Sequence, residues 1–64
     1  MTVTTFICET YFADGKYINT KEYFNSSEEA IERAKAWRAL GHKANAIAFR
    51  VDLATCEVTS NPLD

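Results

Sequence analysis

The feature that most constrains this chain is a capped amphipathic helix, set between two strand-rich halves. Ser26 followed by Glu29 matches a capping box, in which side chains satisfy backbone donors at a helix N-terminus. Gly41 stands where the C′ residue of the same helix is expected. Apolar side chains recur at three- and four-residue spacing and predict the buried stripe of this helix: Ala30, Ile31, Ala34, Trp37 and Leu40.

Two strands are predicted before the helix, over Val3–Phe12 and from Lys16 to about Phe24, because both segments are rich in β-branched and aromatic residues. Gly15 can supply the positive φ that a tight turn needs. A two-residue loop at 14–15 would mix apolar and polar side chains on each face. A three-residue loop at 13–15, with Gly15 as the bulge, separates them, and we predict that register. One face then carries Phe6, Cys8, Phe12, Ile18 and Phe24, and the other carries Val3, Ile7, Glu9, Tyr11, Tyr17, Asn19, Lys21 and Tyr23.

Two further strands are predicted after the helix, over Lys43–Asp52 and Glu57–Ser60. In the first of them we expect the larger set, Asn45, Ile47, Phe49 and Val51, to face the helix, with Ala44, Ala46 and Ala48 on the opposite face. A right-handed crossover favours the strand order 2-1-3-4. The predicted fold is therefore α+β, a ββαββ domain over residues 1–60 with a four-stranded antiparallel sheet and the helix on one face. Residues 61–64 are predicted to be a frayed tail, since Pro62 cannot donate to a strand ladder.

Length and composition limit the class of protein. The 64 residues allow one domain with a small core, which oligomerisation often supplements. No signal peptide or membrane-spanning run is evident, so we expect no membrane association and a reducing cytoplasm in which Cys8 and Cys56 are free thiols. The net charge of −2 argues against a dedicated nucleic-acid binder without excluding one.

No catalytic or metal-ligating pattern is present in the sequence, so we predict a protein that is not an enzyme, with no cofactor and no metal. His42 follows the helix C-terminus, where positive charge is favourable. Cys8 is expected to pack in the core. Cys56 lies in a turn where glycine would be easier, and the acidic neighbour Glu57 does not favour a reactive thiolate.

The open face of the predicted sheet is the leading candidate for a binding site. Its candidate residues are Tyr11, Tyr17, Tyr23, Ile7 and Lys21. Tyrosine combines a large apolar area with a polar tip and is enriched at interfaces, although cross-strand aromatic pairing would also explain it. The expected partner is a protein of unknown identity, and we also expect a homo-oligomer, a dimer of this chain.

An alternative candidate is a basic patch along the second half of the helix and just beyond it. It comprises Arg33, Lys35, Arg38 and Lys43. Such a patch would suit a nucleic-acid-associated regulator that contacts phosphates without reading sequence.

In size, acidity and the absence of a site of its own, the chain resembles the small inhibitors encoded by phages and mobile elements, including anti-CRISPR and other anti-defence proteins. The resemblance covers the whole chain but rests on size and architecture, with no motif match. It implies a stoichiometric binder that blocks a surface of a larger host complex. It assigns no role to any particular residue.

Overall fold

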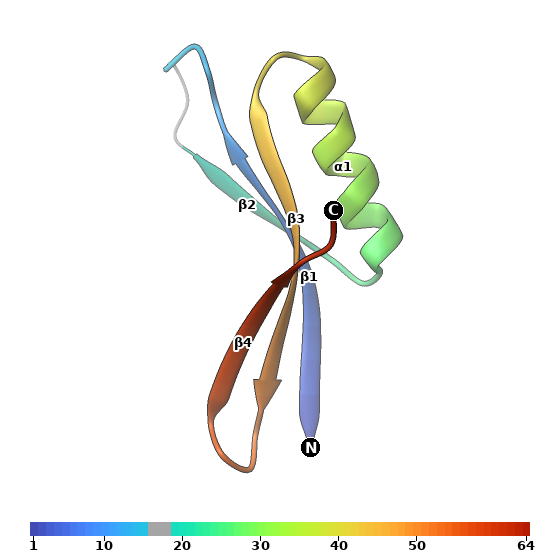
Figure 1. Ribbon diagram of the computed structural model, residues 1–64, viewed down its shortest axis with the longest axis vertical. Coiled ribbons are helices and arrows are strands. Elements are labelled where there is room, and N and C mark those ends of the chain that lie inside the picture. Colours follow the sequence, from blue (N-terminus) through green and yellow to red (C-terminus); the bar gives the residue numbers. More distant parts are fainter. Residues whose placement is uncertain (16–18) are drawn as a thin grey trace.

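The computed structural model describes residues 1–15 and 19–64, and there it forms one antiparallel sheet with one helix (Figure 1). The elements are β1 (Thr2–Tyr11), β2 (Thr20–Phe24), α1 (Ser27–Ala39), β3 (Lys43–Asp52) and β4 (Glu57–Pro62). The strand order is β2-β1-β3-β4, and every neighbouring pair is antiparallel. The predicted ββαββ arrangement and strand order are thus confirmed. The predicted start of the second strand, with Tyr17 and Ile18, lies outside the described residues.

Both ends of α1 are capped by the residues that the sequence indicated. The Ser26 Oγ accepts a hydrogen bond of 3.3 Å from the Glu29 backbone N–H. At the other end Gly41 has φ +93°, and the N–H groups of Gly41 and His42 donate to the carbonyls of Arg38 and Trp37. This pair of bonds is a Schellman motif. Leu40 was wrongly placed in the buried stripe: as the C-cap residue it is 70% exposed.

The first hairpin has the predicted faces but a register that differs by two residues. A loop over 13–15 would place Phe6 opposite Glu22, whereas Phe6 lies opposite Phe24. Gly15 does end a turn, with φ +70° and its N–H donating to the Phe12 carbonyl. The observed register pairs two phenylalanines that both pack against the core. A shift of two residues leaves every side chain on its face, because side chains alternate with a period of two.

The faces of the third strand are the reverse of those predicted. Ala44 and Ala46 are buried beneath the helix, in one cluster with Cys8, Ala30 and Ala34. The register pairs Cys8 with Ala46, so the sheet presents small side chains where the helix lies closest. Around this cluster pack the partly buried side chains of Phe6, Phe24, Ile31, Trp37 and Leu63. The alternate set of β3 therefore lies on the face that the helix does not cover, namely Asn45, Ile47, Phe49 and Val51.

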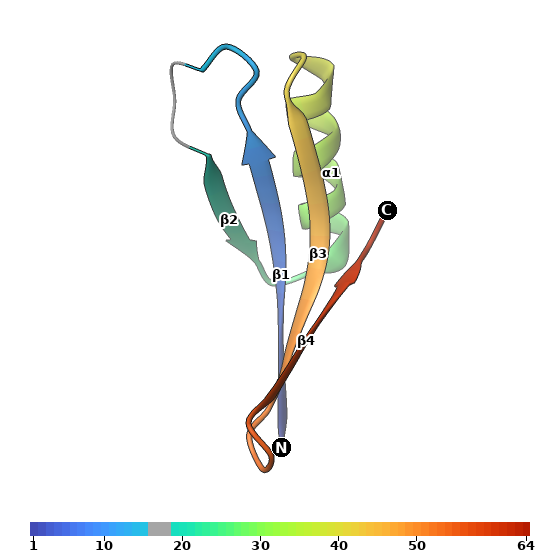
Figure 2. The ribbon, with the colours of Figure 1, turned by 60° about the vertical axis from the view of Figure 1, so that its left-hand side comes forward.

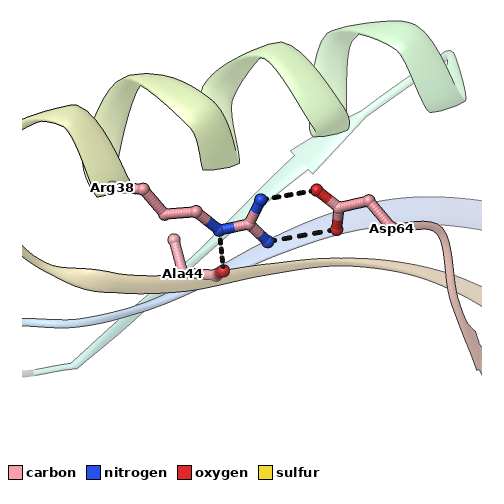
Figure 3. Close-up of polar contacts among 3 residues, drawn as sticks. All are labelled: Arg38, Ala44 and Asp64. Carbon is pink, nitrogen blue, oxygen red and sulfur yellow. Dashed lines mark hydrogen bonds and ion pairs between the residues drawn. The ribbon is translucent and has the colours of Figure 1, made fainter.

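The C-terminal segment is joined to the rest of the fold. Residues 61–64, which we expected to fray, continue β4 to Pro62 and then contact β3 and the helix. The Leu63 N–H donates to the Ala46 carbonyl at 2.8 Å. The Asp64 carboxylate accepts two hydrogen bonds from the Arg38 guanidinium, at 2.6 and 3.1 Å (Figure 3). These contacts hold the chain end against the edge of the core.

The molecule is long and thin, with extents of 41 × 21 × 15 Å. The helix lies beside one end of the sheet, and the β3–β4 hairpin extends beyond it together with the N-terminal end of β1 (Figures 1 and 2). We call this extension, residues 2–5 and 49–60, the arm. Because the helix does not reach the arm, no element of the described chain covers either face of the sheet there.

Candidate interaction surface

The open face of the sheet is built from alternate residues of all four strands. Strand pairing sets its large side chains in cross-strand rows. One row runs Tyr23, Ile7, Ile47 and Pro62, a second runs Thr5, Phe49 and Ser60, and a third runs Val3, Val51 and Val58. We call the apolar members of these rows the apolar patch: Val3, Ile7, Tyr23, Ile47, Phe49, Val51, Val58 and Pro62. The described residues of the three rows include no charged side chain.

Several side chains of the apolar patch are exposed to solvent. Tyr23 is 67% exposed and Val58 54%. Ile7 is only 7% exposed, because it lies between Tyr23 and Ile47 in the same row. Cross-strand contacts between these residues stabilise the sheet, but nothing in the described chain covers them from above. A contiguous exposed apolar surface of this kind is typical of an interaction site.

The other end of the open face is polar. The Glu9 carboxylate lies 3.7 Å from the Lys21 Nζ. The same carboxylate accepts a hydrogen bond of 3.2 Å from the Tyr11 hydroxyl. Asn45 lies beside Glu9, and Lys43 beside Tyr11. These hydrogen-bonding side chains form a rim next to the apolar patch, an arrangement that interfaces commonly have.

Four of the five predicted interface residues, Tyr11, Tyr23, Ile7 and Lys21, lie on this one face. Tyr17 falls outside the described residues. Five of the eight residues of the apolar patch were not predicted from the sequence: Ile47, Phe49, Val51, Val58 and Pro62. The small residues of the helix stripe, Ala30 and Ala34, were the signal that small residues should lie beneath them.

The alternative basic patch is not a set of four free cations. The Arg33 Nε lies 3.2 Å from a Glu22 carboxylate oxygen. Arg38 donates to Asp64 and also, through Nε, to the Ala44 carbonyl at 2.8 Å. The hydrogen bonds from Arg38 lower the pKa of the Asp64 carboxyl, and those bonds also raise the pKa of Arg38. Lys35 and Lys43 are exposed. Two of the four cations therefore already hold carboxylates within the fold.

His42 has a structural partner that the sequence did not indicate. Its Nδ1 accepts a hydrogen bond of 3.1 Å from the Ala13 backbone N–H, so this nitrogen carries no proton in the bonded state. The imidazole also makes edge contacts with Phe12 and Trp37, at centroid distances of 5.1 and 5.8 Å. The side chain thereby joins the turn after β1 to the end of α1.

The two cysteines lie in opposite environments. Cys8 is fully buried, with its Sγ 3.7 Å from the Thr10 hydroxyl, and burial raises the pKa of its thiol. Its predicted packing role is confirmed. Cys56 is exposed and has φ +60°, which agrees with the expectation that glycine would be easier there.

Comparisons with family models, with curated proteins and with solved structures found no match to this chain. In the part of the chain that the structure describes, no group of three or more His, Cys, Asp or Glu side chains could hold a metal ion. Within that same part, α1 is too short and too polar to cross a membrane.

Proposed function

We propose that this protein is a non-enzymatic interaction module that binds a protein surface through the open face of its sheet. The observation that carries the proposal is the apolar patch, uncharged in its described rows and bordered by Tyr11, Lys21 and Lys43. Specific interfaces combine an uncharged centre with a polar rim, which supports this assignment.

The sharper form of the proposal is an inhibitor that blocks a surface of a larger host complex, in the manner of phage-encoded anti-defence proteins. A thin sheet with one face uncovered suits such a role, because it can lie flat against another protein. The chain would then act by occupancy, one copy per target site, and without chemistry of its own.

The alternative, a nucleic-acid-associated regulator, has less support. Phosphate binding needs cations that are available to the ligand, and each phosphate contact contributes to the salt dependence of binding. Arg33 and Arg38 are engaged by Glu22 and Asp64.

The test is capture from a nuclease-treated host lysate with three tagged proteins. These are the unmutated chain, a Tyr23→Ser/Phe49→Ser variant of the open face, and a Leu40→Ser control. Leu40 is an apolar residue about as exposed as Tyr23, but it lies at the end of the helix. The proposal expects one stoichiometric protein with the unmutated chain and the control, and none with the face variant. Equal capture by all three, or by none, would count against it.

A further inference from the structure

We propose that a second copy of this chain stacks its own open face on the apolar patch, so that the free protein is a symmetric dimer of two facing sheets with a helix on each outer side. The inference rests on the proposed function, because it takes the same face as the binding surface and names an occupant for it. It adds a consequence: self-association and target binding use one surface and exclude each other.

The core of the monomer is small. The largest fully buried side chains are Thr10 and Cys8, and the rest of the buried cluster is alanine. Phe6, Phe24 and Trp37 are only partly buried. Small domains with a core of this kind commonly depend on disulfides, metals or oligomerisation. Here Cys8 and Cys56 are both free. A partner needed for folding must be present whenever the chain is, and a second copy always meets that condition.

The monomer is more extended than a compact domain of its size. Its radius of gyration is 12.8 Å, whereas a compact domain of this length has about 10.7 Å. Its accessible surface is 4633 Å², whereas a compact monomer of this mass exposes about 4,100 Å². The surplus, on the order of 500 Å², agrees with the uncovered arm and open face. Stacking two open faces would remove such a surplus from each copy.

The open face is large enough for a second copy to stack on it. β1 and β3 each have ten residues, and strands of that length span about 33 Å. Three strands lie side by side along most of that length, since β4 flanks β3 at one end and β2 flanks β1 at the other. Three strands are together about 14 Å wide, which gives the whole open face a footprint of roughly 500 Å² before the relief of the side chains is counted. Specific interfaces bury about 600–1,000 Å² from each partner, so this footprint lies just under the lower end of that range. The open face therefore offers close to the area that a specific dimer needs.

The charge on the open face also favours stacking of two copies. A symmetric dimer brings each surface patch against its own copy, so a charged patch would repel itself. The described rows of the apolar patch carry no charge, and the nearest charged residues, Glu9 and Lys21, neutralise each other. Stacked sheets lie about 10 Å apart with interdigitated side chains. Tyr23 and Phe49, which are 67% and 36% exposed in the monomer, are large enough to fill that space from both sides.

The test is sedimentation velocity over a concentration series from 1 to about 500 µM, a range that spans micromolar to submillimolar dissociation constants. The proteins are the unmutated chain, Phe49→Glu, the milder Phe49→Thr and a Leu40→Glu control, each shown to be folded by circular dichroism. We expect a dimer for the unmutated chain and the control. Phe49→Glu should raise the dimer dissociation constant at least a hundredfold, and Phe49→Thr about tenfold.

Two outcomes would overturn the inference: a monomer at every concentration, or a dimer that both Phe49 variants leave unchanged. Its failure is distinguishable from failure of the proposed function. A monomeric protein that captures a target, and loses it on Phe49→Glu, would retain the function and reject self-association. A monomeric protein whose lysate capture does not depend on the open face would reject both.

Discussion

The two faces of one sheet differ in what they bury. Beneath the helix lie the small side chains Cys8, Ala44 and Ala46, all almost inaccessible to solvent. On the open face lie larger apolar side chains such as Ile47 and Phe49, and these are partly or largely exposed. In this protein a side chain is buried where the helix closely approaches the sheet, and the hydrophobicity of the residue does not decide its burial. The helix packs closely on the sheet because the side chains on both sides of the contact are small. The larger residues of the opposite face remain available for another molecule.

The largest expected effect on stability comes from substitution of Trp37, which lies at the edge of the side of the sheet that the helix covers. The Trp37 Nε1 donates to a Glu22 carboxylate oxygen at 2.8 Å, and the indole makes an edge contact with Phe12 at 5.2 Å. Trp37→Ala should lower the free energy of unfolding by about 3 kcal/mol. A domain of this size has a total of roughly 3–10 kcal/mol, so the cooperative thermal transition should be lost or strongly lowered. Circular dichroism melting measures it, with Trp37→Phe as the control that keeps a ring. A Trp37→Ala variant that melts like the unmutated protein would contradict this account of the core.

The next effect tests the close approach of helix and sheet directly. Ala34 is fully buried against the sheet, whereas Ala36 on the same helix is exposed. Ala34→Leu forces extra volume into the contact and should destabilise the fold by about 1–3 kcal/mol. Ala36→Leu adds the same atoms in solvent and should change the free energy of unfolding by less than about 0.5 kcal/mol. Urea denaturation of both variants gives the comparison. Equal effects would show that small size at position 34 does not matter.

The same comparison explains how far the sequence could predict the fold. The helix and its caps were predictable because Ser26, Glu29 and Gly41 are local signals that act through neighbouring backbone groups. The strand order followed from the handedness of one crossover. Both predictions rest on rules that do not depend on which side chains pack together in the core.

The faces of β3 could not be predicted in that way. Alternation separates Ala44, Ala46 and Ala48 from Ile47 and Phe49 but does not say which set faces the helix, since both sets are largely apolar. The preference for burying large residues selected the wrong set. The decisive information is the register of β1 against β3, which places Cys8 beside Ala46. That pairing is nonlocal, and Ile47, Phe49 and Val51 of the apolar patch were missed because of it.

A smaller effect concerns the attachment of the C-terminal segment to the covered half. The Asp64 side chain is 21% exposed and that of Arg38 40%, so solvent screens the pair and its contribution should not exceed about 1 kcal/mol. Because Arg38 lowers the pKa of Asp64 in the folded state, the contribution is present above the ordinary value of 3.8. It is lost as the pH falls through the lower, folded-state value. Asp64→Asn should therefore be less stable than the unmutated protein at pH 7, and the difference should shrink as the pH falls below 3.8.

Urea denaturation at pH 7, 5, 4 and 3 measures this trend, with Glu32→Gln as a control on an exposed helix residue. Added salt should reduce the difference at pH 7, because screening weakens a partly exposed ion pair. A difference between Asp64→Asn and the unmutated protein that stays constant down to pH 3 would show that the charge on Asp64 plays no part.

The smallest expected effect on stability concerns Cys56 in the turn of the arm, and it distinguishes the arm from the part of the sheet that the helix covers. Cys56 has φ +60°, and its N–H donates to the Asp52 carbonyl at 2.8 Å. The Asp52 carboxylate also accepts from the Ala54 N–H, so the turn is fixed by contacts that do not involve the cysteine side chain. Glycine removes a left-handed penalty of about 1–2 kcal/mol but adds about 0.5–1 kcal/mol of unfolded-state entropy. Cys56→Gly should therefore stabilise the turn by roughly 0.5 kcal/mol, whereas Cys56→Ala keeps the penalty and should not.

Hydrogen exchange can show where that gain falls. The arm is held by strand pairing alone, so it can open without the helix-covered half. Cys56→Gly should slow amide exchange in the arm about twofold, at Thr59 and its neighbours in β4, and leave the exchange of Ala34 in the helix unchanged. If both amides slow equally, the arm and the covered half unfold as one unit, and the division between them is geometric only. If only the arm responds, the open face includes a segment whose local stability a bound partner can raise independently of the core.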